Sequence, residues 1–201
     1  MILDPRLIQR GALSYTYRGI PTLKDPFDWA LYPMLIWDLK PKTIVEIGSH
    51  EGGSALWLAD LLYSFEIADG VVFSVDLKKP TEVVEGKNLF FIEGNARSLA
   101  DSLSPHLLAR PLLVIEDSDH STETTAAVLD FFAPWMQKGE YIIIEDGIAP
   151  ELYPGQYGGG PGAAIDDFLA RDLRFEVDRR YCDFFGFNAT WNWNGYLRCR
   201  G

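Results

Sequence analysis

Acidic residues follow five apolar runs of strand length, and carboxylates placed in this way could bind a ligand. They are Glu46, Asp76, Glu93, Asp117 and the adjacent pair Glu145 and Asp146. If the runs form a parallel sheet, their carboxyl ends meet at the edge where open α/β sheets bind ligands. Unpaired charges are too costly to bury in a core. The row of acids therefore indicates a binding site, although one or two of them could instead cap helices.

The first half of this row suits a nucleoside. Asp76 ends the second run, where a carboxylate can accept hydrogen bonds from both hydroxyls of a ribose, and Leu77 follows it directly. The turn after the third run contains Gly94, Asn95 and Ala96, which could border the base. We therefore count these five residues as candidate cofactor contacts.

The second half of the row suits a metal ion. Asp117, Glu145 and Asp146 offer hard oxygen ligands, which favour Mg²⁺, with Ca²⁺ and Mn²⁺ as competitors. His120 stands three residues after Asp117, where an imidazole could take a proton from a hydroxyl whose pKa the metal lowers. A histidine that merely caps or packs at a helix start is the alternative. Asp119 is a candidate cap for the helix that begins near Thr122.

The stretch TIVEIGSHEGGSALWLADLL, residues 43–62, changes from a strand pattern to a helical pattern across a glycine turn. Glycines let backbone N–H groups approach a ligand closely, and a helix start adds positive potential. Its spacing differs from the G-x-G-x-x-G of dinucleotide enzymes, and a connection that binds no ligand is the alternative. Its candidate cofactor contacts are Glu46, Gly48, Ser49, Gly52, Gly53 and Ser54.

Strands and helices alternate along the chain, which predicts an α/β fold with a mostly parallel sheet covered on both faces. The expected strands are 43–45, 70–75, 88–92, 112–115 and 141–144, followed by 174–180 and 195–199 as an antiparallel hairpin at the sheet edge. The expected helices are 26–39, 54–62, one that ends at 105–110, 122–135 and 163–169. Residues 1–40 form a lead-in to a single domain that spans 41–201.

Two segments have two interpretations each. Residues 153–162, YPGQYGGGPG, form either a surface loop or a substrate lid with glycine hinges. Residues 181–194 are rich in aromatic side chains, which either belong to the core, the favoured interpretation, or line an apolar pocket. Trp29 and Trp37 could similarly pack in the core or form the surface of a homo-oligomer.

The composition limits the class of protein. The chain has 201 residues, of which 47% are hydrophobic and 23% charged, and this suits one globular domain. A net charge of -11 argues against nucleic acid and anionic membranes as partners. No run approaches the ~20 apolar residues of a membrane span, and the first residues do not resemble a signal peptide. Cys182 and Cys199 are expected to be free thiols of a cytoplasmic protein.

Five motifs in order resemble the cephalosporin hydroxylase-type family of class I S-adenosylmethionine methyltransferases. They are VEIGSHEGGSALWLADLL, FSVDL, FIEGNARS, VIEDSDHS and YIIIEDG, and the resemblance extends from about Gly19 to Arg198. It implies a seven-stranded Rossmann-like sheet with an antiparallel last strand. It also implies that S-adenosylmethionine binds at the glycine turn, with Asp76 on its ribose.

The chain is also similar to metal-dependent O-methyltransferases that act on catechols or macrolide sugars. The resemblance implies that Asp117, Glu145 and Asp146 hold Mg²⁺, and Asp117 also counts among the donor contacts. Catechol enzymes have a lysine at the position of His120, whereas sugar enzymes have a histidine. The resemblance therefore favours a sugar or another aliphatic hydroxyl as the acceptor.

Together these observations predict a Mg²⁺-dependent O-methyltransferase for a hydroxyl of a sugar or natural product, with His120 as the base. Two alternatives stay open. One is a nucleotide- or NAD-binding oxidoreductase or hydroxylase-type enzyme, although the sequence lacks both G-x-G-x-x-G and a two-histidine, one-carboxylate iron motif. The other is a non-catalytic binding protein on a methyltransferase fold.

Overall fold

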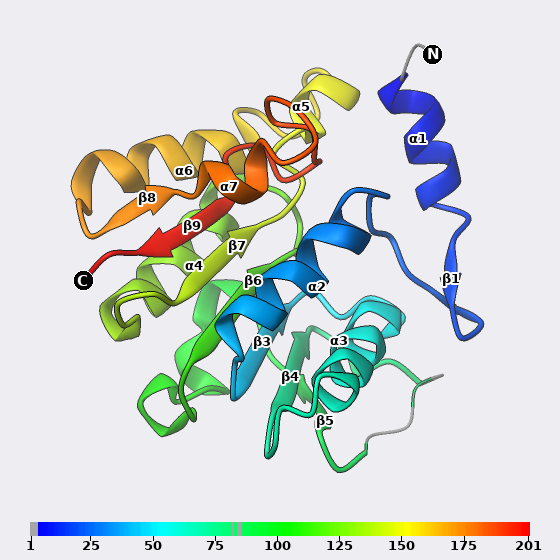
Figure 1. Ribbon diagram of the computed structural model, residues 1–201. Helices are drawn as coiled ribbons and strands as arrows, with labels where there is room; N and C mark the ends of the chain where they lie inside the picture. Colours follow the sequence, from blue (N-terminus) through cyan, green and yellow to red (C-terminus); the bar gives the residue numbers. More distant parts are fainter. Residues whose placement is uncertain (1–3, 82, 84–85) are drawn as a thin grey trace.

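The computed structural model describes residues 4–81, 83 and 86–201, and its centre is a seven-stranded sheet (Figure 1). The strand order is β5-β4-β3-β6-β7-β9-β8. Strands β3 to β7 are parallel to one another, and β9 is antiparallel to both of its neighbours. The α/β fold and its antiparallel last strand are confirmed. The bounds are β3 Thr43–Ile47, β4 Val71–Asp76, β5 Leu89–Glu93, β6 Leu112–Glu116, β7 Tyr141–Ile144, β8 Phe175–Val177 and β9 Tyr196–Cys199.

Helices cover both faces of the sheet (Figure 1), and alternate residues of the central strands pack against the two layers. On β6, Leu113 and Ile115 pack with α2 (Asp28–Leu39) and α3 (Gly53–Ser64). Leu112 and Val114 pack with α4 (Thr122–Phe132) and α6 (Gly160–Arg171). All four side chains are fully buried, which explains why the strand is apolar throughout. Helix α2, in the expected lead-in, belongs to the same core as α3.

The chain between β5 and β6 forms two short 3₁₀-helices, η1 (Ala96–Asp101) and η2 (Pro105–Leu107). The sequence predicts one helix that ends at 105–110, and this prediction is wrong. Ser98 has φ -142° and ψ 48°, which no helix accommodates, and Pro105 cannot donate a helical hydrogen bond. The interruption leaves the Gly94–Ala96 turn at the sheet edge.

The C-terminal segment also differs in part from the prediction. Strand β8 pairs with β9 over three residues only, and its expected continuation to 180 is wrong. Asp178 accepts a hydrogen bond from the Arg180 backbone N–H and caps a short helix, α7 (Arg179–Cys182). The aromatic segment divides, because Tyr181 and Trp191 are buried whereas Phe184, Phe185 and Phe187 are exposed.

The N-terminal segment contains a helix that the sequence analysis misses, α1 (Pro5–Ala12), with Asp4 as its N-cap. A small hairpin follows, formed by β1 (Thr16–Tyr17) and β2 (Ile20–Pro21). Helix α1 contacts a distant part of the chain, because Gln9 donates a hydrogen bond to the Tyr153 hydroxyl. Figure 1 shows α1 apart from the sheet, near α5 (Ala149–Leu152).

Three smaller expectations can be compared with the structure. Trp29 packs against Trp57, with ring centroids 4.2 Å apart, whereas Trp37 is exposed. Cys182 and Cys199 are buried free thiols, as predicted. Helix α6 starts at Gly160, so the expected loop 153–162 is shorter than predicted. In the described part of the chain, no helix has the length and apolarity that a membrane crossing needs.

Candidate functional site

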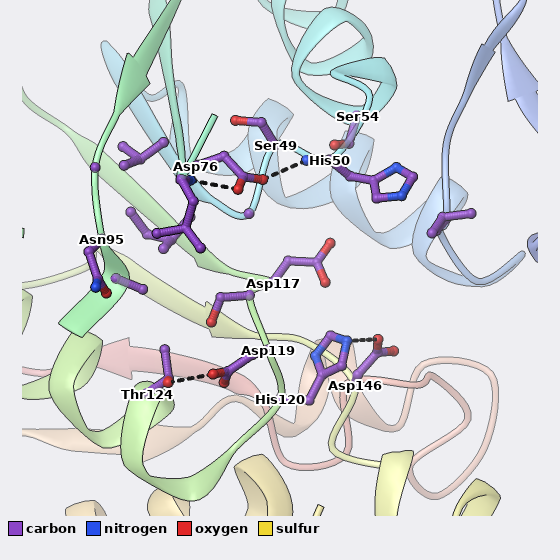
Figure 2. Close-up of a pocket in the computed structure, with 18 of the residues that line it drawn as sticks. Ser49, His50, Ser54, Asp76, Asn95, Asp117, Asp119, His120, Thr124 and Asp146 are labelled. Carbon is purple, nitrogen blue, oxygen red and sulfur yellow. Dashed lines mark hydrogen bonds and ion pairs between the residues drawn. The ribbon is translucent and has the colours of Figure 1, made fainter. Parts of the chain in front are cut away.

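A cavity of about 560 Å³ lies at the carboxyl ends of β3 to β6 (Figure 2). The segment from Pro21 to Lys24 forms part of its wall. Of the expected cofactor contacts, nine line it: Gly48, Ser49, Ser54, Asp76, Leu77, Gly94, Asn95, Ala96 and Asp117. His120 and Asp146 line the same space. The donor half and the metal half of the predicted site therefore share one cavity.

Gly48 lets two strands approach each other at the floor of the cavity. Its φ is +107°, and a Cβ at this position would lie 1.9 Å from the carbonyl oxygen of Asp117. Its N–H donates to the Val75 carbonyl at 2.8 Å. A side chain at Gly48 would separate the turn after β3 from the turn after β6.

Gly52 and Gly53 face away from the cavity in the described structure. A Cβ on Gly53 would meet the Thr22 hydroxyl at 2.1 Å, and a Cβ on Gly52 would meet Phe91 and Val83 at 3.0 Å. These glycines allow the N-terminal segment and the loop after β4 to pack against the start of α3. Their expected contact with a cofactor stays a prediction.

Asp76 is fixed at the rim by two backbone hydrogen bonds. Its Oδ2 accepts from the His50 N–H at 2.9 Å and its Oδ1 from its neighbour Leu77 at 2.7 Å. In the turn after the neighbouring strand β5, Asn95 accepts a hydrogen bond from the Arg97 N–H and caps η1. The carboxylate thus faces the cavity in a defined orientation (Figure 2).

Glu46 lies inside β3 and is fully buried, because the strand continues to Ile47. The expectation that it stands at a strand tip is therefore wrong. Its Oε2 accepts a hydrogen bond from Ser74 at 2.5 Å, and the Ser74 hydroxyl contacts that of Ser49 at 2.6 Å. Burial raises the pKa of Glu46. The carboxyl supports the glycine turn from beneath.

Glu93 ends β5 with an exposed side chain and, in the described structure, lies outside the cavity lining.

Asp117, His120 and Asp146 come together at one end of the cavity. One ligand atom from each lies within 4.8 Å of the other two, so they could share a metal ion. The His120 Nε2 is 3.3 Å from the Asp146 Oδ2, as Figure 2 shows, and its Nδ1 has no partner among the described residues. Both residues have positive φ, 56° and 54°, a strain that accumulates at functional sites. Burial raises the pKa of Asp146 to about 6.

Glu145 takes a different position from its neighbour Asp146. Its Oε1 accepts hydrogen bonds from the Lys24 ammonium at 2.7 Å and from the Tyr32 hydroxyl. The same ammonium contacts the Asp117 Oδ2 at 2.5 Å. Among the described residues, Glu145 faces these groups rather than the cavity. Its expected role as a metal ligand stays a prediction.

Two cationic residues line the cavity but are not predicted by the sequence analysis. Lys24 stands in an irregular segment, where no spacing marks it. Arg97 lines the cavity, donates to the Thr124 hydroxyl at 2.7 Å and contacts Asp119 at 3.3 Å. Asp119 accepts from the backbone of Ser121, which is the true N-cap of α4. The sequence FIEGNARS includes Arg97, but an arginine after a turn has no distinctive signal.

Tyr157 brings the segment after α5 close to His120. Its ring is 5.7 Å from that of His120 and 6.0 Å from that of Tyr153. Helix α1 contacts Tyr153 in turn. Two aromatic side chains therefore lie beside His120, next to the residues that line the cavity.

Comparison with known proteins places this geometry in a family. The family described as rhamnosyl O-methyltransferase/CmcI matches residues 10–200. The rhamnosyl O-methyltransferase of Mycobacterium leprae is 29% identical over 192 residues, covering 90% of this chain and 82% of that protein. Its counterpart in Mycobacterium tuberculosis is 25% identical over 197 residues, covering 90% and 77%.

Solved structures agree with the sequence relatives. CmcI with Mg and SAM has a TM-score of 0.74 and 27% identity, and the match covers 94% of this chain and 78% of that chain. The MycE methyltransferase with Mg, SAH and mycinamycin VI has a TM-score of 0.51 and 16% identity, covering 73% and 40%, and supports the fold alone. Because the family match spans nearly the whole sequence, the chain belongs to the rhamnosyl O-methyltransferase/CmcI family.

Proposed function

We propose that this protein transfers a methyl group from S-adenosylmethionine to a hydroxyl oxygen of a small molecule, in a reaction that depends on Mg²⁺. The observation that carries the proposal is one cavity that joins Asp76, suited to a ribose, to the cluster of Asp117, His120 and Asp146. Membership of an O-methyltransferase family supports the reaction class, and the Mg and SAM bound to CmcI support the two cofactors.

The donor lies between the glycine turn and the turn after β5. Asp76 accepts hydrogen bonds from the ribose hydroxyls, because its two oxygens are already oriented by backbone N–H groups. Gly48, Ser49 and Ser54 face the donor from below, and Leu77 and residues 94–96 border its base. Glu46 acts indirectly, through its hydrogen bond to Ser74 and the contact of Ser74 with Ser49.

The metal ligands are Asp117, Glu145 and Asp146. The residues fit a hard divalent cation, because three neighbouring carboxylates carry more negative charge than the single buried ammonium of Lys24 can balance. Mg²⁺ bound there would supply the positive charge that lowers the pKa of the acceptor hydroxyl. His120 stays outside the ligand set and holds Asp146 through its Nε2.

His120 moves the proton. Its Nε2 pairs with Asp146 at 3.3 Å, which orients the ring at the cavity wall. His120 accepts the proton of the acceptor hydroxyl, and Asp146 stabilises the resulting imidazolium. The hydroxyl oxygen forms a bond to the methyl carbon while the bond from sulfur to that carbon breaks, and S-adenosylhomocysteine leaves.

The acceptor is a sugar or a sugar-bearing natural product. The named relatives act on rhamnosyl groups, and Tyr153 and Tyr157 provide aromatic surface beside His120. A cytoplasmic location is part of the proposal and is supported by two free buried thiols, which suit a reducing compartment. A homo-oligomer is also possible, and the exposed Trp37 is a candidate contact.

A calorimetric titration with Mg²⁺ tests the metal half of the proposal. Native protein should bind one ion, and Asp117→Asn should lose most of this binding. Asp119→Asn is a matched control, because Asp119 lies two residues away but contacts Ser121, Thr124 and Arg97. Equal binding by all three proteins would contradict the assignment of Asp117.

A methyl-transfer assay tests the reaction. The protein is incubated with S-adenosylmethionine and a panel of rhamnosides and other glycosides that carry adjacent hydroxyls. Mass spectrometry should find an added methyl group together with S-adenosylhomocysteine, with loss of product in a chelator and recovery with Mg²⁺. Hydride transfer from any member of the panel to NAD⁺, with oxidation of a hydroxyl to a carbonyl, would instead support the oxidoreductase alternative.

A further inference from the structure

Lys24 is a buried cation inside the acidic cluster. Its side chain is 1% exposed, and its ammonium contacts Asp117 Oδ2 at 2.5 Å and Glu145 Oε1 at 2.7 Å. The Tyr32 hydroxyl donates to the same oxygen of Glu145. Lysine is almost never buried to this degree unless it is paired. In the described structure, the ion pairs of Asp117 and Glu145 are both made with this one residue.

The ammonium is balanced by the carboxylates around it. Asp117 and Glu145 contact it directly, at 2.5 Å and 2.7 Å. Lys24 therefore supplies the positive charge of a buried cluster of ion pairs. Without it, Asp117 and Glu145 would be left as neighbouring buried carboxylates that repel each other.

The backbone that carries Lys24 is fixed, whereas its side chain is flexible and borders the cavity. The adjoining Asp25 accepts hydrogen bonds from the Trp191 N–H at 2.7 Å and the Phe27 N–H at 2.6 Å. Thr22 packs against Gly53 at the start of α3. Lys24 also lines the cavity, and its four-carbon stem can swing without moving the chain.

We propose that Lys24 is an internal counter-ion that occupies the side of the metal site between Asp117 and Glu145 and is displaced when the divalent ion binds. This inference rests on the proposed metal site. Two cations cannot both contact the same carboxylate oxygens in a poorly hydrated site without strong repulsion. Glu145 thus becomes a metal ligand only after the ammonium withdraws into the cavity. Lys24 stabilises the metal-free protein and weakens its affinity for Mg²⁺.

The first test compares Lys24→Met with the native protein in a calorimetric titration with Mg²⁺ alone. Methionine keeps the shape of the stem and removes the charge. We expect the variant to bind Mg²⁺ about tenfold tighter or more. Without metal it should melt at a lower temperature, and saturating Mg²⁺ should raise its Tm by more than it raises that of the native protein. Lys138→Met, at an exposed lysine outside the cavity, is the matched control.

A second test uses the native protein, so it does not depend on how the variant folds. Acetic anhydride labels accessible lysines, and mass spectrometry reads each site. Lys24 should be protected without metal and should become labelled when Mg²⁺ is bound, while the labelling of Lys138 stays constant.

Weaker or unchanged Mg²⁺ binding by Lys24→Met would overturn the inference, as would continued protection of Lys24 in the Mg²⁺-bound native protein. Either result would leave the proposed function intact, because Mg²⁺ would still bind. Failure of both the native protein and the variant to bind Mg²⁺ would overturn the proposed metal site, and the inference with it.

Discussion

His120 and Asp146 are the two residues to which the proposed function gives the proton transfer and part of the metal site. Both occupy left-handed backbone conformations that side chains rarely adopt, and the surrounding structure must hold them there. Their contact leaves one imidazole nitrogen without a partner among the described residues.

Replacement of His120 by glutamine should remove the base and preserve the site. We expect kcat to fall by about 10²–10⁴-fold, the usual contribution of a positioned general base. The Kd for the donor should stay within a factor of two or so, because the donor contacts are elsewhere. His106→Gln is the control, at an exposed histidine outside the cavity. Equal activity of the two variants would contradict the role of His120.

Replacement of Asp76 by asparagine should weaken the binding of S-adenosylhomocysteine. A hydrogen bond to a charged group contributes about 1.5–3 kcal/mol, which corresponds to a loss of roughly 10–100-fold in affinity. Asp101→Asn, at an exposed acid outside the cavity, should bind like the native protein. Isothermal titration measures both. An unchanged Kd in Asp76→Asn would exclude the ribose contact.

At the scale of residues, the sequence predicts the location of a side chain when that location depends only on the end of a strand. Asp76 and Asp117 follow apolar strands, so their place at the sheet edge could be predicted. The burial of Glu46 could not, because it depends on whether the strand continues for one more residue, to Ile47. Lys24 could not be predicted either, since its partners Asp117 and Glu145 are 93 and 121 residues away along the chain.

At the scale of elements, the turn after β3 depends on the close approach of Gly48 to Asp117. Gly48→Ala should lower the free energy of unfolding by about 2–4 kcal/mol, from backbone strain together with overpacking. It should also weaken donor binding. Gly139→Ala is matched, because its φ is +93° but a Cβ there has open space, so it should cost only about 1–2 kcal/mol. Urea unfolding of both variants measures the difference, and equal losses would contradict the close-approach argument.

Helix α7 buries Cys182 against the core. Burial raises the pKa of this thiol from its usual 9.0 to about 11. Because the folded pKa is the higher one, the stabilisation is complete below pH 9 and is lost as the pH rises toward 11. We expect the free energy of unfolding to decrease over this range, by at most ~1.4 kcal/mol per pH unit. Urea unfolding at several pH values should show that the free energy of unfolding falls less steeply with pH in Cys182→Ala than in the native protein. An identical pH dependence in both proteins would contradict the assignment of this effect to Cys182.

The regular elements were predictable and the irregular ones were not. The five parallel strands are apolar on both faces. This pattern predicts a buried strand whichever elements pack against it. The interruption at Ser98 and the early end of β8 depend instead on which residues find a partner, since β9 pairs with only three residues of β8. Helix α1 was missed because only one of its residues is buried, although Asp4 followed by Pro5 is a recognisable start signal.

At the scale of the whole molecule, residues near the N-terminus form hydrogen bonds with residues near the C-terminus. Asp25 accepts a hydrogen bond from Trp191, and Asp28 accepts from Thr190 and Tyr196. These contacts hold the segment that carries Lys24 over the ends of the strands. Periodicity along a sequence carries no information about partners more than 160 residues apart, so this closure could only be seen in the structure.

The most direct test of the central claim is a calorimetric titration of the native protein with S-adenosylmethionine. The proposed function predicts one binding site with a Kd in the micromolar range, both with and without Mg²⁺, because the donor contacts do not include the ion. Detectable one-to-one binding would support the proposed use of S-adenosylmethionine as the methyl donor. The next step would then be to identify the acceptor. No binding at saturating concentrations of the donor would contradict the proposed function at its foundation.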